Sequence, residues 1–501
     1  MTRGAVEIEL KFDAPNPDGV TAWLDQRYPA DDGGWAESRL ADRYFDTSDF
    51  SIARAGYGAR VRRRAGQLTV EIKTDGTVDG ARHQRTEIMG PATIGLEPAR
   101  WPASEARDLL ERLAGGRPLV ERFTIRQRRR ERRLQLDGAE ALASLDDARV
   151  IVGGRTIGRL RGLEVELLSG KRKALRRLAT ELEASGLVEA QPLSKVQLGH
   201  FLAAAQAPIS HDDLFAEAGR KVLARHLLRL LDREPLVRGG DPRALKQMRV
   251  AARRLRSTWR LFEGAYRRSE QKRHVAGLRV LGRRLGEVRD LDVLLAGLPD
   301  DPDLAALAEA WRVERAMAME ALLRHLDSRA HREWAGDHAA FVASPGRATA
   351  RRLEASLVGE HASTRVITAI TGLLSSVSSI ANADEPTLHA LRIQAKRTRY
   401  GIEAFRDVLA TAPAERLRLR LVGLQDSLGA LNDAAIAGAR AEAWAASIDP
   451  APAPATQRAV ERLVFAQRGR IAALRRQAER TWRGLVSATA GRDIERILQS
   501  R

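Results

Sequence analysis

Val6-Glu7-Ile8-Glu9-Leu10-Lys11-Phe12-Asp13 is the stretch that decides the fold of the first part of this 501-residue chain. Its apolar and charged residues alternate strictly, which predicts a β-strand because successive side chains of a strand point to opposite faces. Glu7, Glu9 and Lys11 would then share one face, and the other face would be apolar. Two carboxylates beside an ammonium suit a divalent cation and phosphate better than bulk water, so this face should line a polyanion site.

The same alternation returns along the first 170 residues. Strands are predicted at 43–47, 57–64, 67–74, 85–89, 123–136 and 163–168, and helices near 17–28, 103–114 and 171–185. Charged residues share strand faces as follows: Arg60, Arg62 and Arg64; Glu71 and Lys73; Arg85 and Glu87; Arg126, Arg128 and Arg130; Glu164 and Glu166. Each row could be a solvated strand face. Mixed acidic and basic rows on so many strands favour a barrel closed around a charged lumen.

The composition sets wider limits. A chain of 501 residues is too long for one ordinary core, which predicts two or three domains. The net charge is +19, of which residues 1–200 carry +4 and the remainder +15, so the C-terminal part is the stronger candidate for binding a polyanion. The chain has no cysteine, which excludes disulfides and thiol catalysis. It has no apolar run of about 18 residues, so we expect a soluble cytoplasmic protein without membrane insertion.

The second half, which has helical spacing almost throughout from about residue 210, contains an internal duplication. Leu245-Lys246-Gln247-Met248-Arg249 recurs as Leu388-His389-Ala390-Leu391-Arg392, 143 residues later. The same offset takes Phe262 to Phe405 and Leu285-Gly286 to Leu428-Gly429. A constant register over so many positions predicts two copies of one helical unit.

Each copy contains one helix with a densely basic stripe. Lys246, Arg249, Arg253 and Arg256 fall within an arc of roughly 80° on a helix, away from the apolar residues. The arginines could pair with acids elsewhere on the surface. However, crowded like charges repel one another, and a bound polyanion would relieve that repulsion.

Residues 1 to about 202 resemble a CYTH domain of the triphosphate tunnel metalloenzymes. The resemblance begins with Glu7-x-Glu9-x-Lys11 and continues in the family's order through the charged rows above, Asp146, and Ser194-Lys195. It implies an eight-stranded antiparallel barrel whose lumen binds a triphosphate together with Mg²⁺ or Mn²⁺. The metal ligands that it implies are Glu7, Glu9, Asp146, Glu164 and Glu166. The implied phosphate-contacting or catalytic residues are Lys11, Arg60, Arg62, Lys73, Arg85, Glu87, Arg126 and Arg128, with Lys195 as a weaker candidate.

One position departs from the pattern of that family. Many relatives carry three alternating acids on the late strand, whereas this chain has Gly162 at the first of these positions. The change could loosen the metal site or shift its preference, and it predicts slower turnover rather than loss of binding.

Residues 210–497 resemble a CHAD domain, which implies two pseudo-symmetric helical bundles, at about 210–350 and 355–497. The resemblance rests on the two basic helices and on Leu285-Gly286-x-x-Arg289-Asp290 with Leu428-Gly429-x-x-Asn432-Asp433. It implies binding of inorganic polyphosphate without catalysis. The residues expected to bind it are Lys246, Arg249, Arg253, Arg254, Arg256, Arg283, Arg289, His389, Arg392, Lys396, Arg397 and Arg399. The first repeat has Lys246 where the family often has histidine, so that site keeps a permanent positive charge.

The leading functional hypothesis is therefore a metal-dependent hydrolase of inorganic triphosphate or a related triphosphate, with a polyphosphate-binding helical domain. A polyphosphate sensor with an inactive barrel is the main alternative, and an adenylyl cyclase is a weaker one, since no adenine pocket is recognisable. Aromatic residues make up only 5% of the chain and no basic platform is interleaved with them, which argues against nucleic acid. A P-loop is absent. The resemblance also implies association with polyphosphate granules in the cytoplasm.

Overall fold

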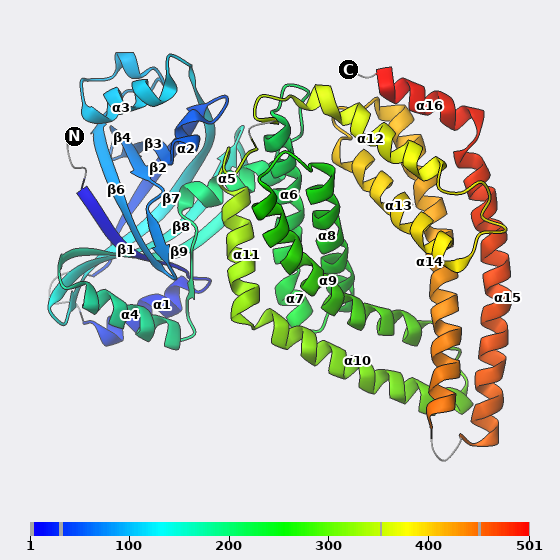
Figure 1. Cartoon of the computed structure of the whole chain (residues 1–501). Helices are drawn as coiled ribbons and strands as arrows, with labels where there is room; N and C mark the ends of the chain where they lie inside the picture. The colour runs from blue at the N-terminus through cyan, green and yellow to red at the C-terminus, as the bar shows by residue number, and fades with distance from the viewer. Residues whose placement is uncertain (1–4, 30–33, 351–352, 449–451, 500–501) are drawn as a thin grey trace. The chain divides into compact units, whose positions relative to one another are not determined.

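The computed structural model describes residues 5–29, 34–350, 353–448 and 452–499 (Figure 1). The chain forms two compact units. The first comprises residues up to 207 together with 336–347, and the second comprises 208–335 and 348–501.

The first unit is built on a closed eight-stranded antiparallel barrel over residues 6–170, as the sequence predicted. Going around the barrel, the strands follow the order β1-β9-β8-β7-β2-β3-β4-β6, and β6 pairs with β1 to close it. Two short strands, β5 and β10, extend the sheet outside the ring. The strands are β1 (Ala5–Asp13), β2 (Ala36–Thr47), β3 (Tyr57–Arg64), β4 (Gln67–Thr74), β5 (Thr77–Asp79), β6 (Arg82–Pro91), β7 (Leu119–Leu136), β8 (Ala139–Val152), β9 (Arg155–Gly170) and β10 (Glu189–Ala190).

Helices cover the apolar outer face of the barrel at two places (Figure 1). Leu10 and Phe12 of β1 are 1% exposed and pack beneath α1 (Pro17–Arg27) and α4 (Arg172–Ala184). A second cluster joins β3, β4 and β6 to α2 (Ser51–Arg54) and α3 (Glu105–Ala114). Because the apolar residues of β1 face these helices, its charged residues must face the lumen.

A further helix, α5 (Lys195–Gln206), closes one end of the barrel. Its apolar side chains pack against Phe123 and Ile125 of β7 and against Val150 of β8, which lie on the inward faces of these strands. Gly199 is required in this helix, since a Cβ at this position would lie 2.1 Å from the Phe123 ring. Lys195 at the start of α5 therefore points into the lumen.

The second unit is entirely helical and repeats with the predicted offset. Its helices are α6 (Phe215–Leu231), α7 (Glu234–Arg238), α8 (Pro242–Leu261), α9 (Arg268–Ala296), α10 (Ala305–Leu326), the first part of α11 (Arg329–Val342), α12 (Val358–Leu374), α13 (Glu385–Ala404), α14 (Thr411–Ser447), α15 (Pro454–Leu485) and α16 (Ala488–Gln499). The pairs α6 and α12, α8 and α13, and α9 and α14 each begin 143 residues apart. Three helix starts at one offset show that the duplication in sequence is a duplication in structure.

The two repeats meet through an aromatic centre. The rings of Phe262 and Phe405, which are equivalent residues, have centroids 5.3 Å apart, and Phe215 lies 4.8 Å from Phe262. Nearby, Arg253 on α8 donates to the Tyr400 hydroxyl on α13 at 2.8 Å. The two basic helices α8 and α13 are therefore neighbours.

Within the described part of the chain, no helix combines the length and the apolar character needed to span a bilayer.

Candidate functional site

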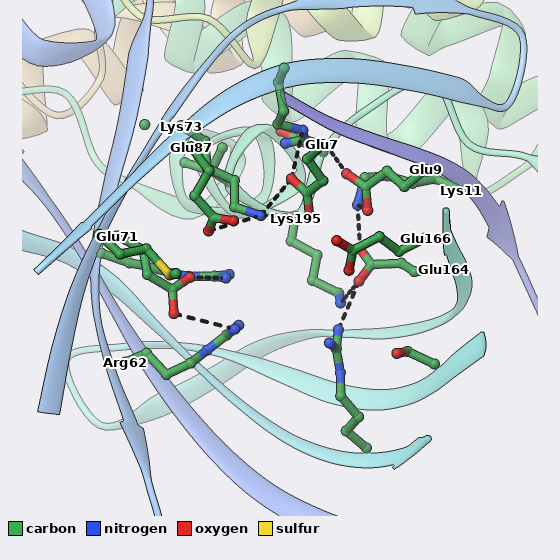
Figure 2. Close-up of a pocket in the computed structure, with 18 of the residues that line it drawn as sticks. Glu7, Glu9, Lys11, Arg62, Glu71, Lys73, Glu87, Glu164, Glu166 and Lys195 are labelled. Atoms are coloured by element: carbon green, nitrogen blue, oxygen red, sulfur yellow. Dashed lines mark hydrogen bonds and ion pairs between the residues drawn. The ribbon is translucent and has the colours of Figure 1, made fainter. Parts of the chain in front are cut away.

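The lumen of the barrel is a cavity of about 240 Å³ whose lining is mostly charged (Figure 2). Its cations are Lys11, Arg60, Arg62, Arg64, Lys73, Arg85, Arg129 and Lys195. Its acids are Glu7, Glu9, Glu71, Glu87, Glu131, Glu164 and Glu166. Alternation along each strand produces this lining, because one face of the strand supplies the outer core and the other supplies the lumen.

Three of the acids form a cluster on β1 and β9. Glu9 lies directly opposite Glu166 in the register of these strands, and Glu7 precedes it on the same face. Burial and the carboxylates of Glu7 and Glu9 raise the pKa of Glu166 to about 7. Glu166 makes no hydrogen bond or ion pair with any described residue. Within this cluster, Glu7 and Glu9 are paired with cations, and Glu166 is the carboxylate without such a partner among the described residues.

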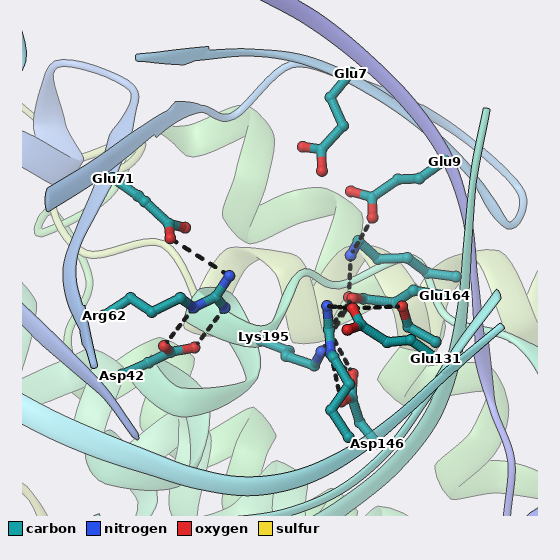
Figure 3. Close-up of polar contacts among 12 residues, drawn as sticks. Glu7, Glu9, Asp42, Arg62, Glu71, Glu131, Asp146, Glu164 and Lys195 are labelled. Carbon is teal, nitrogen blue, oxygen red and sulfur yellow. Dashed lines mark hydrogen bonds and ion pairs between the residues drawn. The ribbon is translucent and has the colours of Figure 1, made fainter. Parts of the chain in front are cut away.

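A second network joins Glu164 to cations on three elements (Figure 3). Glu164 accepts hydrogen bonds from Lys11 and from Arg129, the latter at 2.7 Å, and its Oε2 lies 3.1 Å from the Lys195 Nζ. Burial opposes ionisation of Glu164, but these charges hold its pKa well below the usual range. Asp146 is also bound by Lys195 and by two nitrogens of Arg129, at 2.7 and 2.8 Å. These two carboxylates are already neutralised.

Arginines of β3 occupy another part of the wall (Figure 3). Asp42 accepts from two nitrogens of Arg62, each at 2.8 Å, while the third nitrogen, Nη1, lies 3.4 Å from Glu71. Arg60 also pairs with both Asp42 and Glu71. Burial opposes ionisation of Asp42, but Arg60 and Arg62 lower its pKa to about 2. Asp42 thus fixes the orientation of both guanidinium groups.

Lys73 and Arg85 connect the acid cluster to β4 and β6. The Lys73 Nζ donates to Glu7 at 2.7 Å and lies 3.2 Å from Glu87. Arg85 donates to Glu9 at 2.7 Å. Burial raises the pKa of Glu87, although Lys73 opposes this. These two cations line the lumen together with the acids, where they can exchange a carboxylate for a phosphate oxygen.

The helical unit has its own basic groove of about 1120 Å³. Side chains from α8, α9 and α13 line it, including Arg249, Arg253, Arg256, Arg260, Arg268, Lys272, Arg279, His389, Arg392, Lys396 and Arg397. The two basic stripes predicted from the sequence therefore form one continuous surface instead of two separate sites.

Family models match both units. The model of the CYTH domain matches residues 5–198, and the model of the CHAD domain matches residues 221–442. The chain carries a CYTH domain followed by a CHAD domain. The CYTH match indicates a triphosphate tunnel and an enzyme of the hydrolase or cyclase-like class, whose members depend on metal.

Solved structures resemble each domain. The CHAD domain from the plant Ricinus communis is 26% identical with a TM-score of 0.46, over 57% of this chain and 96% of that chain. PptA from Streptomyces chartreusis is 22% identical with a TM-score of 0.42, over 55% of this chain and 100% of that chain. A protein from Hippeastrum, described as a candidate adenylyl cyclase with a dominant triphosphatase activity, is 16% identical with a TM-score of 0.32, over 38% and 94% of the two chains.

Two predicted residues of the CYTH lumen lie elsewhere. Arg126 and Arg128 are exposed on the outer face of β7, so their predicted place in the lumen is wrong. The inward face of β7 carries Phe123 and Ile125 against α5 and then Arg129, which the sequence reasoning missed. The error has a physical cause: the inward face of β7 is apolar where it packs against α5 and charged farther along the strand. A charged row was therefore taken for the lumen face.

Other predicted CYTH residues line the lumen, and the structure adds to them. Glu7, Glu9, Lys11, Arg60, Arg62, Lys73, Arg85, Glu87, Glu164, Glu166 and Lys195 are all brought together there. Asp146 lies behind Arg129 and is 3% exposed. Arg64, Glu71, Glu131 and the buried Asp42 were not predicted as site residues, although the alternation already placed Arg64 and Glu71 on charged faces. Gly162 lies opposite Asp146 in the register of β8 and β9, and a Cβ there would lie 3.1 Å from the Phe12 carbonyl oxygen.

The metal that the CYTH family uses fits one part of this lumen. No three carboxylate or histidine groups of the described residues are gathered tightly enough to hold an ion as they stand. However, Glu166 makes no ion pair with a described residue and lies opposite Glu9 with Glu7 on the same face, and carboxylate oxygens are the ligands that Mg²⁺ and Mn²⁺ prefer. Glu164 and Asp146 are occupied by cations. Of the five predicted ligands, Glu7, Glu9 and Glu166 lie together on β1 and β9, and Glu166 alone makes no ion pair with a described residue.

The CHAD groove includes only part of the predicted set. Lys246 and Arg254 line a separate hollow beside it with His226. Arg283, Arg289 and Arg399 line neither hollow. The groove instead gains Arg260 from α8 and three cations of α9, namely Arg268, Lys272 and Arg279, which the search for a repeated stripe could not find because α14 has no equivalent cations.

Proposed function

We propose that the CYTH lumen hydrolyses inorganic triphosphate or a related triphosphate with Mg²⁺ or Mn²⁺, and that the CHAD groove binds inorganic polyphosphate. The observation that carries the first part is the acid cluster of Glu7, Glu9 and Glu166 in a lumen otherwise rich in cations. A triphosphate would supply anionic oxygens for the cations of the lumen, and its metal ion would supply a cation for the acid cluster.

The residues divide the work by their chemistry. Glu7, Glu9 and Glu166 would hold the metal, which when bound polarises phosphoryl oxygens and lowers the pKa of a water molecule. Arg60 and Arg62, held by Asp42, present guanidinium forks that suit phosphate oxygens and stabilise charge as it spreads in phosphoryl transfer. Because the attacking group in this hydrolysis would be a water molecule whose pKa the metal lowers, the lumen needs no nucleophilic side chain.

The test is phosphate release from tripolyphosphate, ATP and pyrophosphate with Mg²⁺ or Mn²⁺. Glu7→Gln with Glu9→Gln should abolish metal-dependent release, because two of three carboxylate ligands are lost. Glu111→Gln with Glu183→Gln, which changes two exposed acids of the same domain, should keep it.

Three results would contradict the hydrolase. Equal release by both double variants would place the chemistry elsewhere. Binding of tripolyphosphate without release by the unmodified chain would support a sensor. Formation of a cyclic nucleotide from ATP would identify a cyclase.

The CHAD part is tested by polyphosphate binding to the full chain at fixed salt. Replacing Arg249, Arg253, Arg392 and Lys396 with Ala removes four groove cations and should weaken binding by at least about tenfold. The matched control replaces four exposed arginines outside the groove, Arg458, Arg476, Arg480 and Arg496. Equal affinity of the two quadruple variants would refute the groove. Loss of polyphosphate binding in the Glu7/Glu9 variant would refute two independent sites.

A further inference from the structure

A second basic hollow lies on the outer face of the CYTH barrel, away from the lumen. It is an open groove of about 920 Å³ over five neighbouring strands, β9, β8, β7, β2 and β3. Its cations, all exposed, are Arg39, Arg63, Arg126, Arg128 and Arg149. Neither the proposed hydrolysis in the lumen nor the CHAD groove uses these five residues, called here the outer arginines.

The strand register aligns these residues in a row. Arg126 on β7 lies opposite Arg149 on β8 and, on its other side, opposite Ala41 on β2. Ala41 in turn lies opposite Arg63 on β3. With strands about 4.8 Å apart, this row spans about 14 Å. The small side chain of Ala41 leaves the middle of the row hollow, so a ligand can lie between the guanidinium groups.

The outer arginines are poorly neutralised. Arg39 lies directly opposite Arg128, and like charges in such pairs destabilise a sheet. Arg128 lies 3.9 Å from Glu37 and directly opposite Asp147 on β8. The groove's own acid, Asp147, is taken by Arg159 at 2.7 Å. The other four outer arginines make no ion pair with any described residue. An anion bound in the groove would remove this repulsion.

The groove also meets the lumen at one turn. Along β3, Arg62 and Arg64 line the lumen while Arg63, between them, lines the groove. The following turn residues Ala65 and Gly66 line the groove as well. A phosphate chain lying in the groove would therefore pass close to the end of β3, where Arg64 lines the lumen.

We propose that the outer arginines bind a linear polyphosphate chain, which extends the substrate class of the lumen to chains longer than the lumen can hold. The second clause rests on the proposed triphosphate hydrolysis, whereas the binding itself does not. Guanidinium forks suit successive phosphate groups. No aromatic residue lines the groove, so it lacks the stacking surface that single-stranded nucleic acids require.

The experiment uses the full chain carrying the four Ala substitutions in the CHAD groove, so that this groove contributes less to the measured affinity. In this background, Arg39→Gln, Arg63→Gln and Arg149→Gln are compared with a control that removes three exposed arginines elsewhere on the domain, Arg112, Arg172 and Arg176. Affinity for long-chain polyphosphate is measured at fixed salt, and hydrolysis is measured with both long-chain polyphosphate and tripolyphosphate.

We expect the groove variant to lose about tenfold in affinity and to show a raised KM for the long chain only, while the control loses less than about twofold. Equal losses in the two variants, or no loss in either, would overturn the proposal. An equal loss for a single-stranded oligonucleotide of the same charge would overturn the assignment of the ligand. If tripolyphosphate is not hydrolysed by any form, the lumen proposal fails, and the affinities still decide the groove.

Discussion

Lys396 offers the sharpest prediction for the CHAD groove, because its charge depends on pH near neutrality. This half-buried residue on α13 faces Arg392 on its own helix and Arg249 and Arg253 on α8, with Asp433 on α14 as the opposing acid. Burial and the three arginines lower its pKa to about 7. About half of the Lys396 side chains are therefore neutral at pH 7 in the free protein.

A bound polyphosphate would reverse this effect. The anion neutralises the surrounding arginines and favours the ammonium form, so the pKa of Lys396 returns toward the ordinary value of about 10.4. Binding then takes up a proton above the pKa of the free protein. By linkage, affinity should fall by up to about tenfold for each pH unit between 7 and 9, and should change little below 7, where Lys396 is already charged in both states.

The assay is a titration with long-chain polyphosphate at pH 6, 7, 8 and 9 at fixed ionic strength, with calorimetry in two buffers to count protons. Lys396→Arg keeps the charge at every pH and should abolish the slope above pH 7. His389→Asn, which changes another titratable groove residue, should keep it. A slope that persists in Lys396→Arg, or its absence from the unmodified chain, would refute the reasoning.

The remaining predictions concern the CYTH domain. Asp42→Asn should cost about 3 kcal/mol in the free energy of unfolding, because it leaves two largely buried guanidinium groups to share the carboxylate of Glu71. The stability that ionised Asp42 contributes is present above about pH 4 and should be lost as pH falls toward 2, which denaturant unfolding at several pH values can check. Arg129→Gln should lower tripolyphosphate hydrolysis by at least about tenfold, whereas Arg130→Gln on the outward face should not. Gly199→Ala should destabilise the domain by about 1–3 kcal/mol, because the added methyl meets Phe123 at 2.1 Å.

The sequence predicted best where one rule determined the structure. The strands at 57–64 and 67–74 have the observed bounds, because alternation and the Gly66 turn leave no competing pattern. Strand β8 was missed. Its first half, Ala139-Glu140-Ala141-Leu142-Ala143, has the composition of a helix, and pairing with β7 and β9 imposes the extended conformation on it.

The site could be predicted on those strands whose charged face is the face that lines the lumen. This is so on β1, because helices cover its apolar face and Glu7, Glu9 and Lys11 must therefore point into the lumen. It is not so on β7, because the inward face of this strand is apolar beside α5 and becomes charged only farther along. Only the position of α5 shows that Arg129, rather than Arg128, faces inward. Such an interior feature arises from residues far apart in the sequence, so no local pattern encodes it.

The duplication in the CHAD domain explains both the shape of its groove and its one-sidedness. Equivalent basic helices meet beside the Phe262–Phe405 pair, so two stripes become one surface. The helices that follow have diverged: Lys272 on α9 corresponds to Glu415 on α14, and the latter pairs with its neighbour Arg418 at 2.6 Å. The groove therefore continues over α9 and not over α14.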